Sequence, residues 1–482
     1  MKRLLTLAFL LLSFGAFSQV FWTPAVAVST NAFGNLHPRV TLDKNGNPLI
    51  LWGNSGSNKA YFSRWAGSSF TSPVALNPAT IPVFAASWAG PDIASHGDTV
   101  YAVYKHTPED TNHIYITRSV DGGQNFAAPV RVDGFVLDSN TRFPTVTTDA
   151  TGNPIVAFMK FDTMFMNAKW VVAKSTDMGN TFSPDILASG YSGGNVCDCC
   201  PGHILSVNNK AMVSYRNNLS NIRTIWTAFS PNNGISFSNG IQADATNWMV
   251  MACPSSGPDA IQVGDSMYTV FMSGGGGTNR VYMSKSVVST QQLASSARLT
   301  GDNWALTAQN YPRAASTGNA ATIVWKENAN STTRICLKFT DSLQRGFSLS
   351  YDTLASGTVE NADVAMSPGV IHLVYQDDNS GNVMYRRGIY STAPGSVQNI
   401  TSCSKAIKIF PNPAHTYFTS TDDIGQVAAC TLIDNNGKSI NINPAYTNGK
   451  LNIPLSGIAM GTYTVLLADH TGQTYSSKLI VE

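Results

Sequence analysis

Apolar runs of strand length recur seven times along the chain. Each run follows a polar turn and ends in an aromatic or hydrophobic residue, and most of the units begin at or near a proline. The seven units are residues 37–52, 90–104, 142–158, 200–215, 257–271, 311–325 and 361–375. Their starts lie roughly 50 to 58 residues apart, a period typical of propellers and solenoids. The pattern therefore predicts a fold built from repeated β-units.

A second, shorter pattern lies in the turn after the second strand of the clearest units. Residues 119–126 and 175–182 have the spacing Ser-x-Asp-x-Gly-x-x-aromatic, and residues 230–237 are a weaker copy with Asn in place of Asp. The carboxylate can accept hydrogen bonds from backbone N–H groups of its own turn, and the glycine supplies a positive φ. We expect these turns to be structural, with calcium or substrate binding as the alternative.

These turns resemble the Asp-boxes, or BNR repeats, of the sialidase superfamily. The resemblance covers roughly residues 20–400 and implies an all-β fold, a β-propeller of four-stranded blades. Seven units indicate seven blades, whereas sialidases proper have six, so a six-bladed ring with one unit as an appendage is the alternative. Residues 21–28 resemble the closing strand at residues 126–132, and we expect them to complete the last blade and close the ring.

Composition agrees with a turn-rich β protein. Of the 482 residues, 43% are hydrophobic and only 12% are charged, and there are 39 Gly and 23 Pro. The net charge of +2 and the lack of a basic run argue against nucleic acid as a partner. The length allows two or three domains, or one large repeat domain with a small one.

The first residues have the layout of a signal peptide. Lys2 and Arg3 precede an apolar run over residues 4–17, and cleavage before Gln19 would remove residues 1–18. The alternative is a membrane anchor, which needs about 20 apolar residues, more than this run has. We therefore expect the chain to be exported.

The last residues form a separate unit, residues 405–482. Its marks are a Phe-Pro-Asn-Pro opening at 410–413, an Asp-x-x-Gly-Lys turn at 434–438, a Gly-x-Tyr strand at 461–463 and a Lys-containing strand at 478–482. A unit of this size can form a small β-sandwich.

This unit closely resembles the type A C-terminal sorting domain of type IX secretion. The resemblance implies handling by the type IX secretion machinery, passage across the outer membrane, and then release or attachment at the cell surface. Residues 19–402 would be the sialidase-like propeller that it carries. An ordinary adhesive β-domain is the alternative.

In a propeller, equivalent positions of the units form a ring around one axis. The position after the proline is occupied by Arg39, Asp92, Thr145, Gly202 (followed by His203), Asp259, Arg313 and Asp363. Five of these seven are charged in a chain of low charge, which predicts a polar funnel for an ionic or sugar ligand. The alternative is a structural network between blades, because buried charges need partners whatever their function.

Cysteines gather before the fourth and fifth units. Cys197, Cys199 and Cys200 precede His203, and Cys253 has a comparable place one unit later. Three uses remain open: a disulfide between the two loops, a site for copper(I) or zinc built from the thiolates and His203, or a reactive thiol. The Cys-x-Cys-Cys-Pro pattern resembles a sialidase-like family of exported bacterial proteins, and that resemblance implies no activity.

The sialidase resemblance also implies a catalytic set, namely an arginine cluster, a Tyr nucleophile with a Glu partner, and an Asp acid. The candidates for substrate binding are Arg39, Arg142, Arg216, Arg223 and Arg313, with Asp259 and Asp363 beside them. The candidates for catalysis are Tyr215, Tyr375 and Tyr385 as nucleophile and Asp92 as acid. No glutamate fits the family's motif, so the set is incomplete.

Three functions follow as hypotheses. The first is a glycan-binding propeller that also hydrolyses its ligand, as an exo-α-sialidase-like glycoside hydrolase. The second is a non-catalytic module that recognises carbohydrate or a surface. The third is a propeller that binds a soft metal through its cysteines. We expect a monomer whose ligand is a glycan or another small polar molecule.

Overall fold

The computed structural model describes residues 20–29, 33–109, 112–134, 140–162, 164, 166–301, 306–390, 404–420, 422, 424, 426–434, 439–447, 450–469 and 473–482. All regular secondary structure in these residues is β-strand, so the predicted all-β class is confirmed. The predicted signal peptide, residues 1–18, lies outside the described residues. The described chain has no helix that is long and apolar enough to span a membrane.

Seven antiparallel sheets contain the described strands from Val20 to Tyr390. The first sheet contains β3 (Asn35–Leu42), β4 (Pro48–Asn54), β5 (Lys59–Arg64) and β6 (Val74–Ala75). The second contains β7 (Asp92–His96), β8 (Thr99–Lys105), β9 (Ile114–Ser119) and β10 (Val130–Arg131). The third contains β11 (Asn140–Thr148), β12 (Pro154–Phe161), β13 (Lys169–Lys174) and β14 (Ile186–Leu187).

The fourth sheet contains β16 (His203–Val207), β17 (Lys210–Asn218), β18 (Ile225–Ser230) and β19 (Asn239–Gln242), with β15 (Asn195–Val196) also paired to β17. The fifth contains β20 (Asp259–Val263), β21 (Ser266–Ser273), β22 (Arg280–Val287) and β23 (Gln292–Arg298). The sixth contains β24 (Leu306–Thr317), β25 (Ala320–Ala329), β26 (Thr332–Thr340) and β27 (Asp352–Gly357).

The seventh sheet combines the two ends of this region. It contains β28 (Val359–Ser367), β29 (Val370–Asp377) and β30 (Asn382–Tyr390). Two strands from the start of the described chain, β1 (Val20–Trp22) and β2 (Val26–Ala27), pair with β30, with Val20 opposite Tyr390. The predicted pairing of residues 21–28 with the last repeated unit is therefore present, and it leaves only short edges in the ring.

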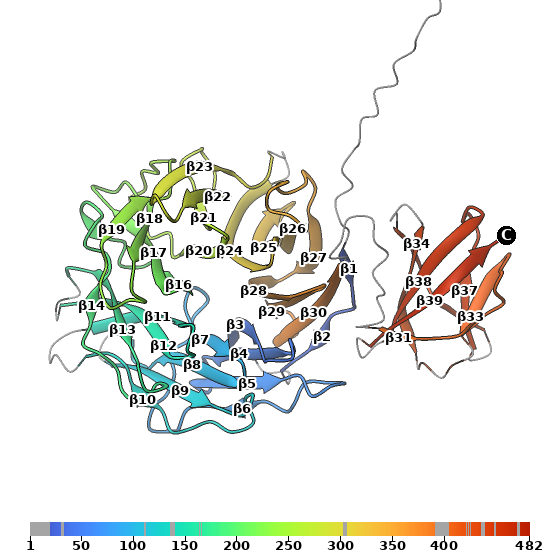
Figure 1. Ribbon diagram of the computed structural model, residues 1–482, viewed down its shortest axis with the longest axis horizontal. Coiled ribbons are helices and arrows are strands. Elements are labelled where there is room, and N and C mark those ends of the chain that lie inside the picture. The colour runs from blue at the N-terminus through green and yellow to red at the C-terminus, as the bar shows by residue number, and fades with distance from the viewer. Residues whose placement is uncertain are drawn as a thin grey trace, which may run out of the picture.

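Each sheet packs on the next through a shared hydrophobic cluster. Such clusters join every successive pair of the seven sheets, and one joins the seventh to the first. In this last cluster, Val374 of β29 packs with Ile50 and Trp52 of β4. Figure 1 shows the resulting ring of sheets around a common centre, which is the arrangement of a β-propeller.

The Ser-x-Asp turns are closed by their own side chains. Asp121 Oδ1 accepts hydrogen bonds of 2.9 Å from the backbone N–H groups of Gln124 and Asn125. The matching atoms of Asp177 and Asn232 each accept one from the backbone N–H four residues on, also at 2.9 Å. These are the bonds that the spacing predicts, and they use the side-chain oxygens within the turn.

The described residues between 404 and 482 contain two further sheets. One contains β31 (Ser404–Ala406), β39 (Thr474–Val481), β38 (Gly461–Asp469), β34 (Val427–Asp434) and β35 (Ser439–Ile442), and the other contains β32 (Ile409–Phe410), β33 (Tyr417–Ser420), β37 (Lys450–Pro454) and β36 (Ala445–Thr447). Phe418 and Ile453 of the second sheet share one hydrophobic core with Leu432 and Val465 of the first. Residues 435–438 of the predicted turn lie outside the described residues.

Candidate functional site

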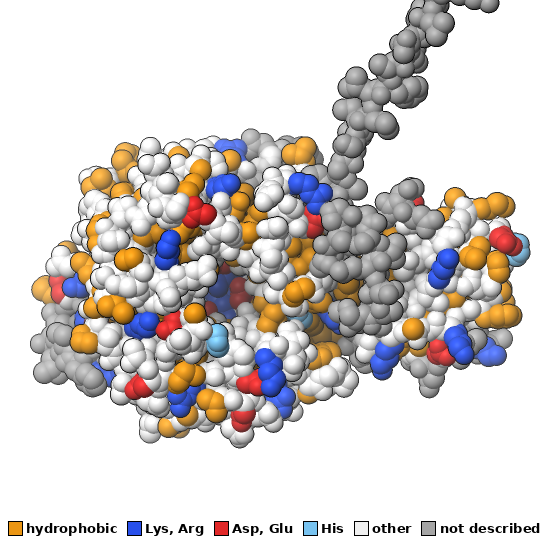
Figure 2. Space-filling model, in the orientation of Figure 1, with side chains coloured by type: hydrophobic (Ala, Val, Ile, Leu, Met, Phe, Trp, Pro, Cys, Tyr) orange, Lys and Arg blue, Asp and Glu red, His pale blue; other side chains and the backbone are white. Residues whose placement is uncertain are grey.

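A pocket lies at the centre of the ring, and residues from all seven repeated units line it. Five of the seven aligned positions contribute directly: Arg39, Asp92, Thr145, Gly202 and Arg313. Figure 2 shows the hollow in the middle of the ring, with basic and acidic side chains inside it. We call it the axial pocket. The equivalent positions therefore converge on one axis.

A β-bulge directs side chains into the axial pocket in four of the sheets. The register of the first strand shifts between Leu36 and Arg39, Arg142 and Thr145, Asn310 and Arg313, and Glu360 and Asp363. Within these bulges His37, Phe143, Tyr311 and Asn361 have φ between 43° and 56°, and all four line the pocket. A positive φ is uncommon outside glycine, and bulges are enriched where a side chain must be re-aimed.

Three aspartates of the ring join one sheet to the next. The carboxylate of Asp92 accepts a hydrogen bond from the N–H of Val146 at 3.1 Å. In the same way Asp259 accepts from Ala314 at 2.7 Å, and Asp363 accepts from Val40 at 2.9 Å. Each acceptor belongs to one repeated unit, and each donor follows the aligned position of the next. These carboxylates therefore act as clamps between neighbouring sheets.

Cations of the ring also pair across sheets. The Arg39 Nε lies 3.7 Å from an oxygen of Asp92, and the Arg313 Nε lies 3.0 Å from Asp363 and 3.5 Å from Asp259. The ring thus contains much of the inter-blade network that was the alternative to a ligand site.

His203 belongs to this network. Its Nδ1 lies 2.9 Å from Asp259 Oδ1. Burial acts to raise the pKa of Asp259. The electrostatic interactions with Arg313 and His203 outweigh burial, so the pKa lies below its ordinary value. Asp259 is therefore an ionised carboxylate beside the Arg313 guanidinium, the His203 imidazole and a backbone N–H.

The basic side chains of the pocket differ in charge state. Burial, followed by the charges of Arg39 and Arg313, lowers the pKa of His37 well below its ordinary value, so its imidazole is neutral. Burial and the charge of Arg313 lower the pKa of Arg39 to about 10. Burial also acts to lower the pKa of Arg313, but the nearby Asp259, Asp363 and Asp92 raise it above its ordinary value. Both guanidinium groups are therefore charged.

The predicted arginine cluster is dispersed. Arg39 and Arg313 line the axial pocket, whereas Arg142, Arg216 and Arg223 do not. Arg142 pairs with Glu109 at 3.4 Å, and its guanidinium lies over the ring of Phe161.

The candidate tyrosines are also outside the pocket, buried between sheets. Tyr215 donates to Ser192 at 3.0 Å, Tyr385 contacts His372 Nδ1 at 2.8 Å, and Tyr375 lies in a hydrophobic cluster. Burial raises the pKa of all three, that of Tyr215 to about 12. None is placed or activated as a nucleophile facing the pocket.

Some pocket residues were not among the predicted site residues. Trp88 lines the pocket with 40% of its side chain exposed, and His37, Tyr311 and Asn361 line it from the bulges. The last three lie two residues before an aligned position, so their repeated place in the units is a usable signal. Trp88 stands in the connection before β7, where no periodic pattern marks it.

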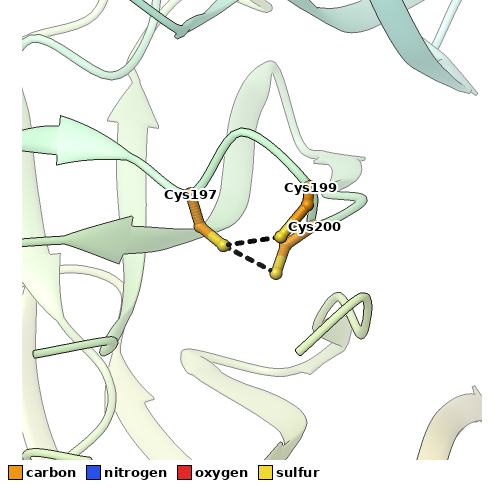
Figure 3. Close-up of side chains that lie close together, drawn as sticks. All are labelled: Cys197, Cys199 and Cys200. Carbon is orange, nitrogen blue, oxygen red and sulfur yellow. Dashed lines mark hydrogen bonds between the residues drawn. The ribbon is translucent and has the colours of Figure 1, made fainter. Parts of the chain in front are cut away.

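A second group of polar residues lies beside the fourth sheet. The Sγ of Cys197 is 2.9 Å from that of Cys200 and 3.6 Å from that of Cys199 (Figure 3). We call these three residues the cysteine cluster. The tight turn between β15 and β16 brings them together, because the N–H of Cys200 donates to the carbonyl of Cys197 at 3.3 Å.

Two buried arginines accompany the cysteine cluster. Arg223 Nη1 donates to Cys197 Sγ at 2.8 Å. Arg216 is fully buried, and donates to the carbonyl of Met272 at 2.7 Å and to that of Ser256 at 3.3 Å. Hydrogen bonds from the neighbouring thiols, and then the charges of Arg223 and Arg216, lower the pKa of Cys197.

The neighbouring thiols are shifted the other way. Hydrogen bonds with Cys197 and Cys200 raise the pKa of Cys199, and burial raises that of Cys200.

The other two predicted members of this site do not join the three-sulfur group. His203 faces Asp259 in the axial network, and Cys253 is exposed, with its sulfur grouped with Cys199 and the Asp198 carboxylate. No disulfide joins the cysteines that the structure describes.

Comparison with known proteins defines the C-terminal part first. Residues 408–482 match the Secretion system C-terminal sorting domain family. The chain is therefore exported by type IX secretion and is secreted or attached to the cell surface. A search of curated proteins finds no match to the chain.

Solved structures resemble the ring. An ulvan lyase, from a new family of polysaccharide lyases, superposes with a TM-score of 0.50 at 9% identity, over 77% of this chain and 96% of its own. A Trypanosoma rangeli sialidase gives a TM-score of 0.43 at 11% identity, over 94% and 88%, and a Hadza microbial sialidase gives 0.44 at 13%, over 64% and 68%. The first of these likenesses shows a shared fold.

Proposed function

We propose that residues 19–402 are a seven-bladed β-propeller that recognises a glycan at the axial pocket without cleaving it. Residues 405–482, as a β-sandwich sorting domain, deliver this propeller to the outside of the cell. The observation that carries the proposal is the exposed Trp88 in the lining of a pocket that also contains two guanidinium groups.

An exposed aromatic face beside polar groups suits a sugar. Trp88 is 40% exposed although it lies at a concave site, and tryptophan combines a large apolar face with an N–H donor. Binding sites commonly pair such a surface with a few polar groups that fix the orientation of the ligand. Arg313, His37 and Asn361 are these groups.

Arg313 favours an acidic sugar. Its Nε is used by Asp363, and its guanidinium lies in the pocket wall. A guanidinium binds a carboxylate through two parallel hydrogen bonds when two N–H groups are available. The cavity volume is about 60 Å³, room for only a few waters at about 10–15 Å³ each. The carboxylate of the sugar would enter the pocket while its ring stacks on Trp88.

The dispersal of the other catalytic candidates supports recognition over hydrolysis. Arg142, Arg216 and Arg223 do not reach the axial pocket, and Tyr215, Tyr375 and Tyr385 are buried elsewhere. The proposed acid, Asp92, is occupied by the N–H of Val146 and the hydroxyl of Thr145. An exo-α-sialidase would need these groups around one sugar.

Calorimetry with the full chain tests the proposal. We expect binding of an oligosaccharide ending in sialic or uronic acid, and weaker binding of its neutral counterpart. Trp88→Ala should weaken binding about tenfold, equivalent to about 1.4 kcal/mol. The control is Phe33→Ala, because Phe33 is 75% exposed and does not line the pocket.

Two results would contradict this proposal. Equal affinity of the Trp88 and Phe33 variants would remove the axial pocket as the binding site. Turnover of a fluorogenic sialoside by the wild-type protein, lost in Asp92→Asn, would replace recognition with hydrolysis.

A further inference from the structure

The cysteine cluster has the geometry of a three-sulfur ligand set. Cys197, Cys199 and Cys200 come from one tight turn, and their Sγ atoms all lie within 4.8 Å of one another. Cys197 and Cys200 are buried and Cys199 is partly exposed, so the set is shielded yet open on one side. In Figure 3 the three sulfurs point toward one another.

The guanidinium groups of Arg216 and Arg223 are a second, independent observation that favours anionic sulfur at this site. Arg223 donates to the Cys197 sulfur, whereas Arg216 donates to backbone carbonyls, and both are buried. Neither forms a salt bridge with a carboxylate of the described residues. Arg216 Nη1 and Arg223 Nε are buried without a hydrogen-bond partner. Buried cations are costly unless negative charge lies beside them.

The nearest acid does not supply that charge fully. Asp244 interacts with Arg216, but burial raises the pKa of its carboxyl group, and it accepts from the N–H of Thr246 at 2.7 Å. Among the described residues, the Cys197 sulfur accepts a hydrogen bond from Arg223 at 2.8 Å, so the cysteine cluster can supply negative charge there when it binds as thiolates.

We propose that Cys197, Cys199 and Cys200 bind one copper(I) ion as three thiolates, with Arg216 and Arg223 neutralising part of their charge. On binding, the thiol protons pass to solvent, and no electron is transferred. Thiolates select soft ions such as copper(I), zinc and iron–sulfur clusters. Protein zinc sites prefer four ligands in a tetrahedron. Within the described residues, no fourth Cys, His, Asp or Glu ligand atom lies within 4.8 Å of all three sulfurs, whereas Cys253 and Asp198 lie within that distance of the Cys199 sulfur alone.

The adjacent group supplies a matched control. Cys253 is exposed, and its sulfur groups with Cys199 and Asp198, outside the three-sulfur set. Cys253→Ser therefore removes a neighbouring thiol of the same loop pair while leaving the proposed ligands intact.

The test is titration of the reduced full chain with copper(I) under anaerobic conditions, in competition with a chromophoric copper(I) chelator. We expect one tightly bound copper per chain and an X-ray absorption spectrum with sulfur ligands only, in three-coordinate geometry. Cys200→Ser and Cys199→Ser should each weaken binding at least tenfold, and Cys253→Ser should not change it. Circular dichroism checks folding, and the partly exposed Cys199 keeps the test valid if the Cys200 variant is unfolded.

Several outcomes would overturn the proposal. They are the absence of tight copper(I) binding in the folded wild type, loss of binding in Cys253→Ser, and equal or tighter binding of zinc(II) in the same competition. A Cys197–Cys200 disulfide in the protein secreted by cells, detected by mass spectrometry, would also overturn it and assign these thiols to a structural link.

Discussion

The axial pocket and the cysteine cluster both bury charged groups, but they balance this charge differently. Around the axial pocket Asp92, Asp259 and Asp363 each meet an arginine and a backbone N–H of the following sheet. In the cysteine cluster Arg216 and Arg223 are buried beside sulfur, with hydrogen-bonding atoms left over. The contrast teaches that the ring aspartates serve the fold, because their partners are complete, whereas the arginines of the cysteine cluster keep polar atoms without a partner.

The largest expected effect comes from breaking the complete set. Asp259→Ala removes the partner of His203, Arg313 and the N–H of Ala314 together. Loss of one member of a buried ion pair costs about 3–5 kcal/mol, because the other charge stays buried. Denaturant unfolding measures the change.

A surface pair gives the control for Asp259→Ala. Lys44 and Asp98 lie 2.6 Å apart but are largely exposed, so Asp98→Ala should cost no more than about 1 kcal/mol. If the two variants lost similar stability, the aspartates of the axial pocket would not be clamps between sheets.

A smaller loss is expected in the incomplete set. Arg223→Leu removes one hydrogen bond to the Cys197 sulfur, a charge-assisted bond worth about 1.5–3 kcal/mol. Arg223→Lys keeps a cation and should lose less. Unfolding of the reduced, metal-free protein measures both. If Arg223→Leu lost as much stability as Asp259→Ala, the charged groups of the two regions would be equally well paired, which would contradict the comparison.

The smallest effect should come from the exposed turns, which show what a carboxylate does without burial. Asp121→Asn should cost less than about 1 kcal/mol, because Asn232 closes the third turn with the same backbone bond at 2.9 Å.

The effect of Asp121 should depend on pH. Side-chain and backbone hydrogen bonds from Asn125 and that from Ser119 lower the pKa of Asp121 to about 2. A lowered folded-state pKa stabilises above the ordinary value of about 3.9 and ceases to do so as the pH falls to about 2. The difference between wild type and Asp121→Asn should therefore vanish in that window in acid unfolding curves. A difference that grows on acidification would contradict this role.

The sequence predicted the scaffold better than the site. The period of the seven units brought Arg39, Asp92 and Arg313 to one pocket, because position within a repeat determines distance from the axis. The sequence grouped Arg39 and Arg216 as candidate ligands of one pocket. Arg216 instead lies in β17, the second strand of its unit, which is buried from Ala211 to Asn217. Side chains there face the neighbouring sheets.

The clamps and Trp88 could not be predicted for different reasons. Which cation Asp259 meets depends on how one sheet is rotated against the next, and no local pattern records that. Trp88 lies in an irregular connection, where its exposure follows from the path of the chain. By contrast, the cysteine cluster was visible in the sequence because its three members share one turn.

The pairing of β1 with β30 has a consequence for assembly. The seventh sheet contains residues near Val20 together with residues near Tyr390, so it stays unfinished until almost all of the ring has been synthesised. Contacts of such long sequence separation form late and slowly. Until then the open sides of the first and last sheets remain exposed, so residues near Val20 and Tyr390 must meet before the ring can close.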